Sequence, residues 1–543
     1  MPEYREVLAS FFTVRRWLRS NEVQSGPALT LQAIWADATK AEQEKKNTPA
    51  RGRKGFVYKL EPDSQIMRGT NGAQQMVYPP TWPEPKAAET KPPVSEPPAS
   101  EPPSSEPRRP LSDLVLNGVY FDPRTLILDF KLLWLQVQLH THVTAQVYTR
   151  AQWDDSICAV NSTDRGFKVA AAFDFGSYVL AFVTIDILFT PHWASTRAEL
   201  PIQHSDIYTE PLKFMACVAD WIETRILRTK SNRDSLAIQV IRTIAHEIFG
   251  GMGVYTVCEV FFLAGLSPFL TEAELFNHPN RVYRLCAAYW VFAQEAHTKM
   301  EDELLRPNYH EFVLTASVAA RQRFISYVHV FGKASVFVSQ RMWDAHHDYE
   351  DCLMQLSLDE HNIIRGPDVG LFDVFEPDFL RPAFLDTCPV EFGPLIFGES
   401  HWVERFNRAP SVPGAPLNPL TLMYRNLELH TNSSHLNLDR YPSLFSENPK
   451  ARILSPRLFN GQKAIWTVYG MFPENIIPPV QELKTTRIST SVRDIQLAAE
   501  AERKTSLLSY IIEKTRKAAV GPLEYCGLGR IIYRQRAGHE NPL

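Results

Sequence analysis

The period of hydrophobic and polar positions changes along the chain and divides it into segments. Residues 136–149 alternate apolar and polar side chains, which is the period of a half-buried strand. Residues 167–189 are apolar almost throughout, as is typical of a central strand pair or of a buried helix. We therefore expect some sheet within 136–189.

Helical periodicity replaces this pattern from Thr209 onward. Thr209 as a capping hydroxyl and Pro211 in the first turn predict a helix start, and Thr271 and Glu274 have the spacing of a capping box. Apolar residues then recur three and four positions apart. The pattern predicts a packed helical block over residues 205–360.

Prolines and asparagines return repeatedly between Gly366 and Pro479, which favours long ordered loops and short strands over helices. Residues 490–519 have the pattern of one long helix, and a basic tail follows it. We expect the loop-rich part to project from the body and the C-terminal helix to dock on a neighbour.

A proline-rich spacer separates the first 78 residues from the rest. It holds three imperfect five-residue repeats, PPVSE, PPASE and PPSSE over 92–106, which favour an extended, semi-rigid path. Upstream, apolar residues at helical spacing share one short segment with three arginines. This segment predicts an amphipathic basic helix.

These patterns predict a mainly α fold with a minor α+β component. It would be a large helical shell-type domain with a loop-rich projection and a disordered or extended N-terminal arm. The expected parts are a basic amphipathic arm (1–78), a Pro-rich linker (79–110), a mainly helical core with strand at 136–189 (111–365), a loop-rich protruding region (366–485), and a C-terminal helix with a basic tail (486–543).

Charge is uneven although the net charge of the 543 residues is only -4. Residues 1–60 hold eleven Lys or Arg against six acids, so contact with a polyanion would come from local patches. The candidate nucleic-acid-binding residues are Arg15, Arg16, Arg19, Arg51, Arg53 and Lys54. The competing interpretation is a solvated arm that packs on a partner.

No segment gathers the residues of a known catalytic chemistry. His246-Glu247 lacks the second histidine of a zinc protease because position 250 is glycine, and Asp174-Phe175-Gly176 lacks the other motifs of a kinase. The run 249–253 (FGGMG) follows a helix and has no Lys-Ser/Thr after it, so it fits no phosphate loop. His346 and His347 point in different directions on a helix, which favours a polar face over a metal site. We therefore expect no catalytic residues, cofactor or metal.

The seven cysteines are widely spaced, which indicates buried thiols in a reducing compartment. The most apolar run, 175–185, is about half the roughly 20 residues of a membrane helix, so we expect no membrane contact.

In layout, the chain resembles the capsid proteins of partitiviruses, small double-stranded RNA viruses of fungi and plants. The resemblance is carried by LNGVYFDPRTL (116–126), the helical block 209–345 and PGAPLNPLTLMYRN (413–426). It implies homodimers that assemble into an icosahedral shell in the virion and host cytoplasm. It also implies an arm facing the interior and non-specific electrostatic contact with an RNA genome. The PPxSE repeats depart from this family.

Two other functions fit the sequence. An intracellular helical scaffold would bind partners through the Pro-rich tether, and an enzyme could bring dispersed catalytic residues together only in the fold.

Overall fold

The computed structural model describes residues 3–39, 42, 55–82, 109–314, 327–330, 336–348 and 373–454, with short gaps at 63, 65, 70–72, 141–142, 163–166, 185–186, 188, 202, 229–232, 269, 386–387, 411–416 and 430–435. The repeats within 83–108 and the predicted C-terminal helix and tail lie outside the described residues. No helix in the described part is both long and apolar enough to cross a membrane.

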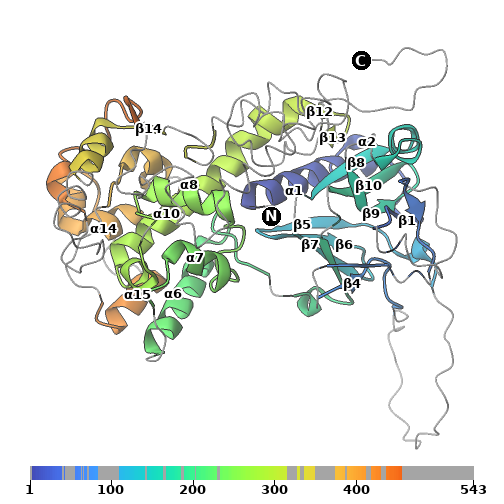
Figure 1. The fold of residues 1–543 in the computed structure, drawn as a ribbon, viewed down its shortest axis with the longest axis horizontal. Coiled ribbons are helices and arrows are strands. Elements are labelled where there is room, and N and C mark those ends of the chain that lie inside the picture. Colours follow the sequence, from blue (N-terminus) through green and yellow to red (C-terminus); the bar gives the residue numbers. More distant parts are fainter. Residues whose placement is uncertain are drawn as a thin grey trace, which may run out of the picture.

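One half of the molecule is built from two antiparallel sheets (Figure 1). The first has the order β2-β1-β9-β10-β8, and the second has the order β11-β7-β6-β5. Their bounds are β1 Ala33–Ala36, β2 Tyr58–Lys59, β5 Gly118–Asp122, β6 Thr125–Asp129, β7 Trp134–Leu139, β8 Thr144–Thr149, β9 Lys168–Asp174, β10 Tyr178–Thr184 and β11 Phe189–Ala194. The strands expected within 136–189 are thus present, and the apolar run 167–189 includes the neighbouring pair β9 and β10.

The prediction of a mainly α fold is wrong. The fold is α+β, because nine strands between Ala33 and Ala194 assemble into two sheets that share an apolar core of their own. Antiparallel pairing between distant strands, such as Ile34 with Phe173, leaves no local period that a sequence pattern reveals. Small elements flank these sheets: η1 Leu111–Asp113, β3 Met67–Arg68, β4 Gln75–Met76, α4 Arg150–Gln152, η2 Trp153–Cys158 and η3 Arg197–Glu199.

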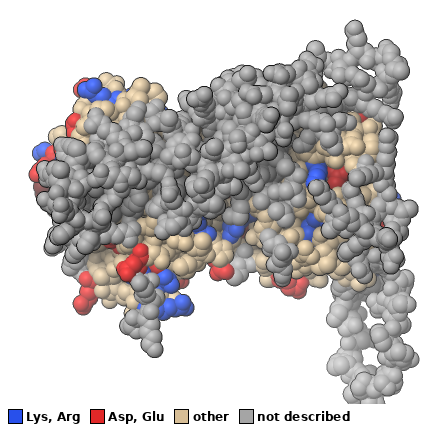
Figure 2. Space-filling model, viewed as in Figure 1, with Lys and Arg blue, Asp and Glu red and all other residues tan. Residues whose placement is uncertain are grey.

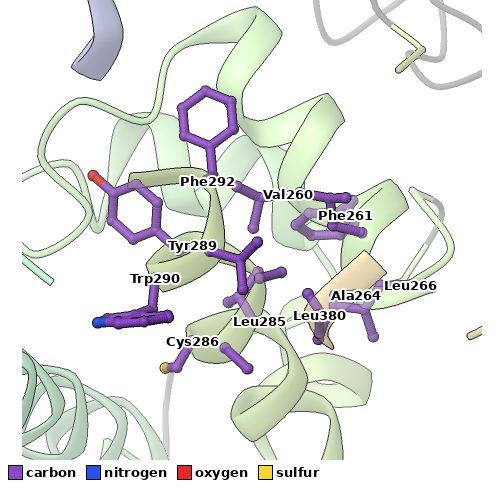
Figure 3. Close-up of a cluster of buried hydrophobic side chains, with 14 of the residues drawn as sticks. Val260, Phe261, Ala264, Leu266, Leu285, Cys286, Tyr289, Trp290, Phe292 and Leu380 are labelled. Carbon is purple, nitrogen blue, oxygen red and sulfur yellow. The ribbon is translucent and has the colours of Figure 1, made fainter. Parts of the chain in front are cut away.

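The other half is helical and has a second core. Its helices are α6 Pro211–Leu227, α7 Ala237–Thr243, α8 Val254–Ala264, α9 Glu272–Phe276 and α10 Pro279–Glu295, which continues into the π-helical stretch η4 Ala296–Leu305. Figure 3 shows part of this core, where side chains of α8 and α10 converge with Leu380. Thr271 caps α9 in a capping box, as predicted, whereas the Thr209 hydroxyl donates to Asp206 and caps no helix.

The expected projection is also wrong for the described part of 366–485, because many of its large apolar side chains belong to the helical core. Phe375, Phe392 and Tyr424 are buried there with the residues of α8 and α10. Its elements are η7 Pro377–Leu380, α13 Arg381–Phe384, α14 Phe392–Phe397, η8 His401–Arg405, α15 Pro419–Asn426, η9 Leu438–Arg440 and β15 Arg452–Leu454, which pairs with β14 Val336–Val338. The elements η5 Arg306–Asn308, β12 Tyr309–His310 and β13 Val313–Leu314 connect the halves.

The N-terminal segment is a buried structural helix, not an arm. Helix α1, Tyr4–Leu18, lies between the two halves, and α2, Asn21–Gln24, follows it (Figure 1). Leu8 and Phe12 belong to the helical core, whereas Val14 and Trp17 belong to the sheet core. Residues 1–78 are therefore not separate, since α1 and β1 are integral to the fold.

Candidate functional site

Several buried polar side chains lie where α1 meets the helical half. The Glu3 carboxylate accepts hydrogen bonds from the backbone N–H groups of Tyr255 and Thr256, at 3.1 and 2.7 Å, and so caps the start of α8. Burial raises the pKa of Glu3, and the hydrogen bonds from Thr256 and Tyr255 oppose that shift. Glu3 thus lies at the N-terminus of α1 and binds the N-terminus of α8.

The glycine-rich run 249–253 makes this joint possible. A side chain on Gly253 would collide with the Glu3 carboxylate. The carbonyl of Gly251, a residue at φ +82°, accepts a hydrogen bond from the backbone N–H of Tyr4 at 3.0 Å. Sequence reasoning excluded a phosphate loop here. The sequence did not reveal that these glycines leave room for Glu3 and Tyr4 of the same chain.

A tyrosine, an aspartate and a histidine meet beside this joint. The Tyr4 hydroxyl donates to Asp206 Oδ1 at 2.6 Å, and its oxygen lies 3.0 Å from His297 Nε2. The ring of Tyr208 stacks on His297 with centroids 4.4 Å apart. Burial lowers the pKa of His297 to about 4, although the Asp206 carboxylate opposes this shift. The described side chains pack around these groups, so the cluster has the features of a structural hydrogen-bond network.

This histidine predicts a pH dependence of stability. Because its folded pKa lies below the ordinary value, the unfolded chain binds the proton more tightly. The contribution of neutral, buried His297 to the free energy of unfolding is complete above about pH 6.5. It is lost as the pH falls toward about 4, by at most about 1.4 kcal/mol per pH unit. We expect urea unfolding between pH 7 and pH 5 to show a shallower pH dependence in His297→Gln than in the unaltered chain. Equal slopes would contradict this assignment.

The predicted nucleic-acid-binding arginines have three different environments. Arg15 forms an ion pair with Glu301 at 2.9 Å, the guanidinium of Arg16 lies 5.1 Å from the ring centre of Tyr309, and Arg19 is exposed at the end of α1. Arg51, Arg53 and Lys54 lie outside the described residues. Figure 2 shows basic and acidic side chains interspersed over the described part of the visible face.

The other sequence candidates serve structure. Asp174 accepts hydrogen bonds from Arg150 and Trp35, at 2.7 and 3.1 Å, and from the backbone N–H of Gly176 in the turn between β9 and β10, at 2.9 Å. The rings of His346 and His347 are 6.1 Å apart at 77°, as expected for adjacent positions on a helix. Among the described residues, no group of three His, Cys, Asp or Glu side chains could hold a metal ion.

A polar groove of about 550 Å³ lies between residues 340–348 and 440–451. Charges of both signs line it, including Arg341, Asp344 and Glu447. Arg341 reaches Glu376 at 3.3 Å, and Arg440 pairs with Asp348, so both of these cations have internal partners.

Two exposed apolar pairs lie in different halves of the molecule. Phe337 and Ile453 face each other across β14 and β15, above strand residues that are buried in the helical core. Met67 and Met76 face each other across β3 and β4, beside β11 of the sheet half. Sequence reasoning missed both pairs, because the four strands are only two or three residues long and show no period.

Comparisons with known proteins give no family. No family model matches the sequence, and no curated protein matches it. Among solved structures, the Lactococcus lactis formamidopyrimidine DNA glycosylase bound to AP-site-containing DNA gives a TM-score of 0.32 at 15% identity, over 56% of this chain and 86% of that chain. The same enzyme in complex with Fapy-dG-containing DNA gives 0.30 at 14% identity, over 55% and 86%. Both scores are too low to establish a common fold, so they carry no argument about this chain.

Proposed function

We propose that this protein is a structural subunit that assembles with copies of itself into a shell. The observation that carries the proposal is the presence of exposed apolar pairs in both halves of the molecule, Phe337 with Ile453 and Met67 with Met76. A subunit with one self-associating surface forms only a dimer, whereas a subunit with two separate surfaces can bind further copies and form larger assemblies. Exposed apolar side chains that cluster mark interaction surfaces more often than scattered ones do.

The buried ionisable groups fit a structural role. Glu3 caps α8, Glu272 pairs with Arg225 and Arg233 at 2.6 and 2.8 Å, and Asp373 holds two arginines. Each group stabilises a junction between elements that are distant in the sequence. This structural role explains why the group is buried, and no catalytic role is needed to explain it.

The proposal that the shell encloses double-stranded RNA, in a virion or in host cytoplasm, rests on the resemblance to partitivirus capsid proteins. RNA contact would be non-specific, and Arg16 and Arg19 are the exposed arginines of α1 that could take part. The engagement of Arg15 by Glu301 and the mixed surface charge favour weak contact, which suits a genome that must move inside its shell.

Sedimentation velocity of the full chain tests this function. We expect species much heavier than a dimer to grow with concentration, since several faces contribute to assembly. Nuclease-resistant RNA should sediment with them when the protein is isolated from cells that supply it. A monomer at every concentration and salt would refute self-assembly, whereas heavy species without RNA would refute the RNA contact alone.

A further inference from the structure

The second sheet, β11-β7-β6-β5, has an apolar face and a polar face. Residues that pair directly across neighbouring strands point to the same face, and side chains alternate between the two faces along each strand. Leu126, Leu128 and Leu135 belong to the sheet core and so define the apolar face. The opposite face, called the polar face below, carries the side chains of Tyr120, Thr125, Trp134, Gln136, Gln138 and His192.

Two aromatic rings and an arginine meet at one end of the polar face. The ring centres of Tyr120 and Trp134 lie 5.7 Å apart, and the guanidinium of Arg197 lies 4.7 Å from the ring centre of Tyr120 and 5.9 Å from that of Trp134. Tyr120 is 37% exposed, Trp134 is half-buried, and Arg197 is exposed. Arg197 donates to the neutral Gln203 Oε1 at 3.1 and 3.2 Å, and it forms no ion pair with any residue that the structure describes. The three side chains therefore present ring faces and an unpaired positive charge to solvent.

The rest of the polar face carries polar side chains without partners among the described residues. The side chains of Gln138 and His192 are half-buried and make no hydrogen bond there. Arg124, in the turn between β5 and β6, forms neither an ion pair nor a side-chain hydrogen bond within the described part of the chain. Burial, and after it the charge of Arg124, lower the pKa of His140, whose Nε2 lies 2.6 Å from Thr190 Oγ1 on the polar face. Arg124 thus lies beside this face, with donors that no described residue uses.

The carboxylates near the polar face compensate these arginines only in part. Asp122 and Asp129 are at most 8% exposed, and each accepts a hydrogen bond from the backbone N–H two residues further on, at 3.1 and 2.8 Å. Glu199 is exposed, and its Oε2 accepts from the backbone N–H four residues earlier, at 3.0 Å. The charge of Asp122 acts on Arg124 without an ion pair, and Lys131 adds an exposed cation in the turn between β6 and β7. A ligand that approaches this face therefore meets cations before it meets the buried aspartates.

We propose that the polar face binds single-stranded RNA through the rings of Tyr120 and Trp134 and the guanidinium groups of Arg124 and Arg197. The inference rests on the proposed RNA contact and identifies its surface and the form of RNA that binds there. Unpaired bases stack on aromatic rings and on guanidinium planes, while cations beside the rings bind the phosphates. Trp134 and Gln138 are four residues apart on β7, about 13 Å along the strand, so the rings and Arg124 can bind different nucleotides of one RNA strand.

This chemistry favours a single strand over a duplex and over a second copy of the chain. A duplex keeps its bases stacked inside the helix, so it could use the arginines but not the rings. Unpaired arginines complement phosphates, whereas a second copy would bring the same unpaired arginines to a two-fold contact. Because Tyr, Trp and Arg also anchor protein interfaces, self-association has to be measured alongside RNA binding.

The first test removes the two rings from the full chain. Tyr120→Leu with Trp134→Leu keeps apolar bulk, and we expect it to raise the dissociation constant for a short labelled single strand of RNA by about 10-fold or more, because the bases lose their stacking partners. Phe445→Leu is the matched control, since Arg381 lies 3.9 Å from the centre of that half-buried ring in the helical half, and it should leave the constant unchanged. Fluorescence anisotropy gives the constants, and circular dichroism verifies the fold.

The second test removes the two cations. Arg124→Gln with Arg197→Gln should weaken binding of the same strand and make the plot of log K against log salt shallower by about 1.4, since each phosphate contact of a single strand contributes about 0.7. Arg405→Gln is the matched control, because Arg405 is exposed on η8 in the helical half, and it should change neither quantity. A duplex of the same sequence should bind more weakly than the single strand, and the Leu pair should not alter its binding.

The outcomes separate this inference from the proposed function. If RNA binds but neither double variant changes its affinity, this face is refuted and RNA contact through another surface stands. If the Leu pair weakens the duplex as much as the single strand, or weakens self-association and leaves RNA binding intact, the inference also fails. A chain that binds no RNA contradicts both the inference and the proposed RNA contact, whereas a monomer that binds the single strand through this face contradicts the proposed shell alone.

Discussion

Replacing Trp17 by alanine is expected to lower the free energy of unfolding by about 3–5 kcal/mol. Trp17 is fully buried, and its ring lies 5.7 Å from that of Phe175 and 5.8 Å from that of Tyr178, centre to centre. Alanine leaves a cavity where α1 meets the sheet core, and the neighbouring strands cannot collapse into it without losing their register. Chemical unfolding followed by far-ultraviolet circular dichroism measures the change.

Arg19→Ala is the matched control on the same helix end. Arg19 is exposed, so its removal should alter stability by no more than about 0.5 kcal/mol. If Trp17→Ala were equally mild, α1 would be a dispensable arm, as the charge pattern first indicated, and the burial described above would not hold in solution.

Asp373→Ala is also expected to lower the free energy of unfolding by about 3–5 kcal/mol, in this case because a buried ion pair is broken. The Asp373 carboxylate accepts from Arg281 Nε at 2.9 Å and also from Arg284, and the side chains of Asp373 and Arg284 are fully buried. Burial alone raises the pKa of Asp373, but Arg284 and Arg281 outweigh it and hold the pKa below its ordinary value. Without the carboxylate, two buried guanidinium groups lose their counter-charge.

The control for this substitution is an exposed ion pair. Asp302 and Arg306 lie 2.8 Å apart, and about 60% of each side chain is exposed (59% and 60%). Asp302→Ala should therefore change stability by less than about 1 kcal/mol. Equal losses at Asp302 and Asp373 would contradict the buried position of the Asp373 cluster.

Local signals in the sequence predicted local structure well. The alternation within 136–149 and the apolar run 167–189 correspond to β7 to β10, and the capping box at Thr271 starts a helix. These features depend on neighbouring residues, whose spacing the sequence displays directly.

The placement of α1 could not be predicted in this way. Its polar residues suggested a solvated face, but Arg5 pairs with Glu295 at 2.8 Å, and Ser10 accepts from the backbone N–H of Ala145 on β8 at 3.2 Å. Burial of a polar side chain depends on a partner that is hundreds of residues away or on another element. The arginine cluster looked like an RNA-binding arm because the acidic and aromatic partners of Arg15 and Arg16 are remote in the sequence.

The loop-rich segment 366–485 was also predicted incorrectly from the sequence, for a different reason. Its prolines favoured loops and short strands over helices, whereas the described part holds the helices α13, α14 and α15 and the one strand β15. They also suggested a projection, whereas Phe375, Phe379 and Phe397 pack into the helical core. Proline content reports where regular structure ends and does not report whether a segment packs. The exposed pairs on β3–β4 and β14–β15, which carry the proposed function, required the strand register.

Electron microscopy of the full-length protein, expressed alone and purified without denaturation, tests self-assembly most directly. We expect closed particles of uniform diameter, and we expect Phe337→Thr with Ile453→Thr to reduce their number while the variant stays folded. Fields that contain only single subunits or dimers, at every protein concentration and salt, would contradict it.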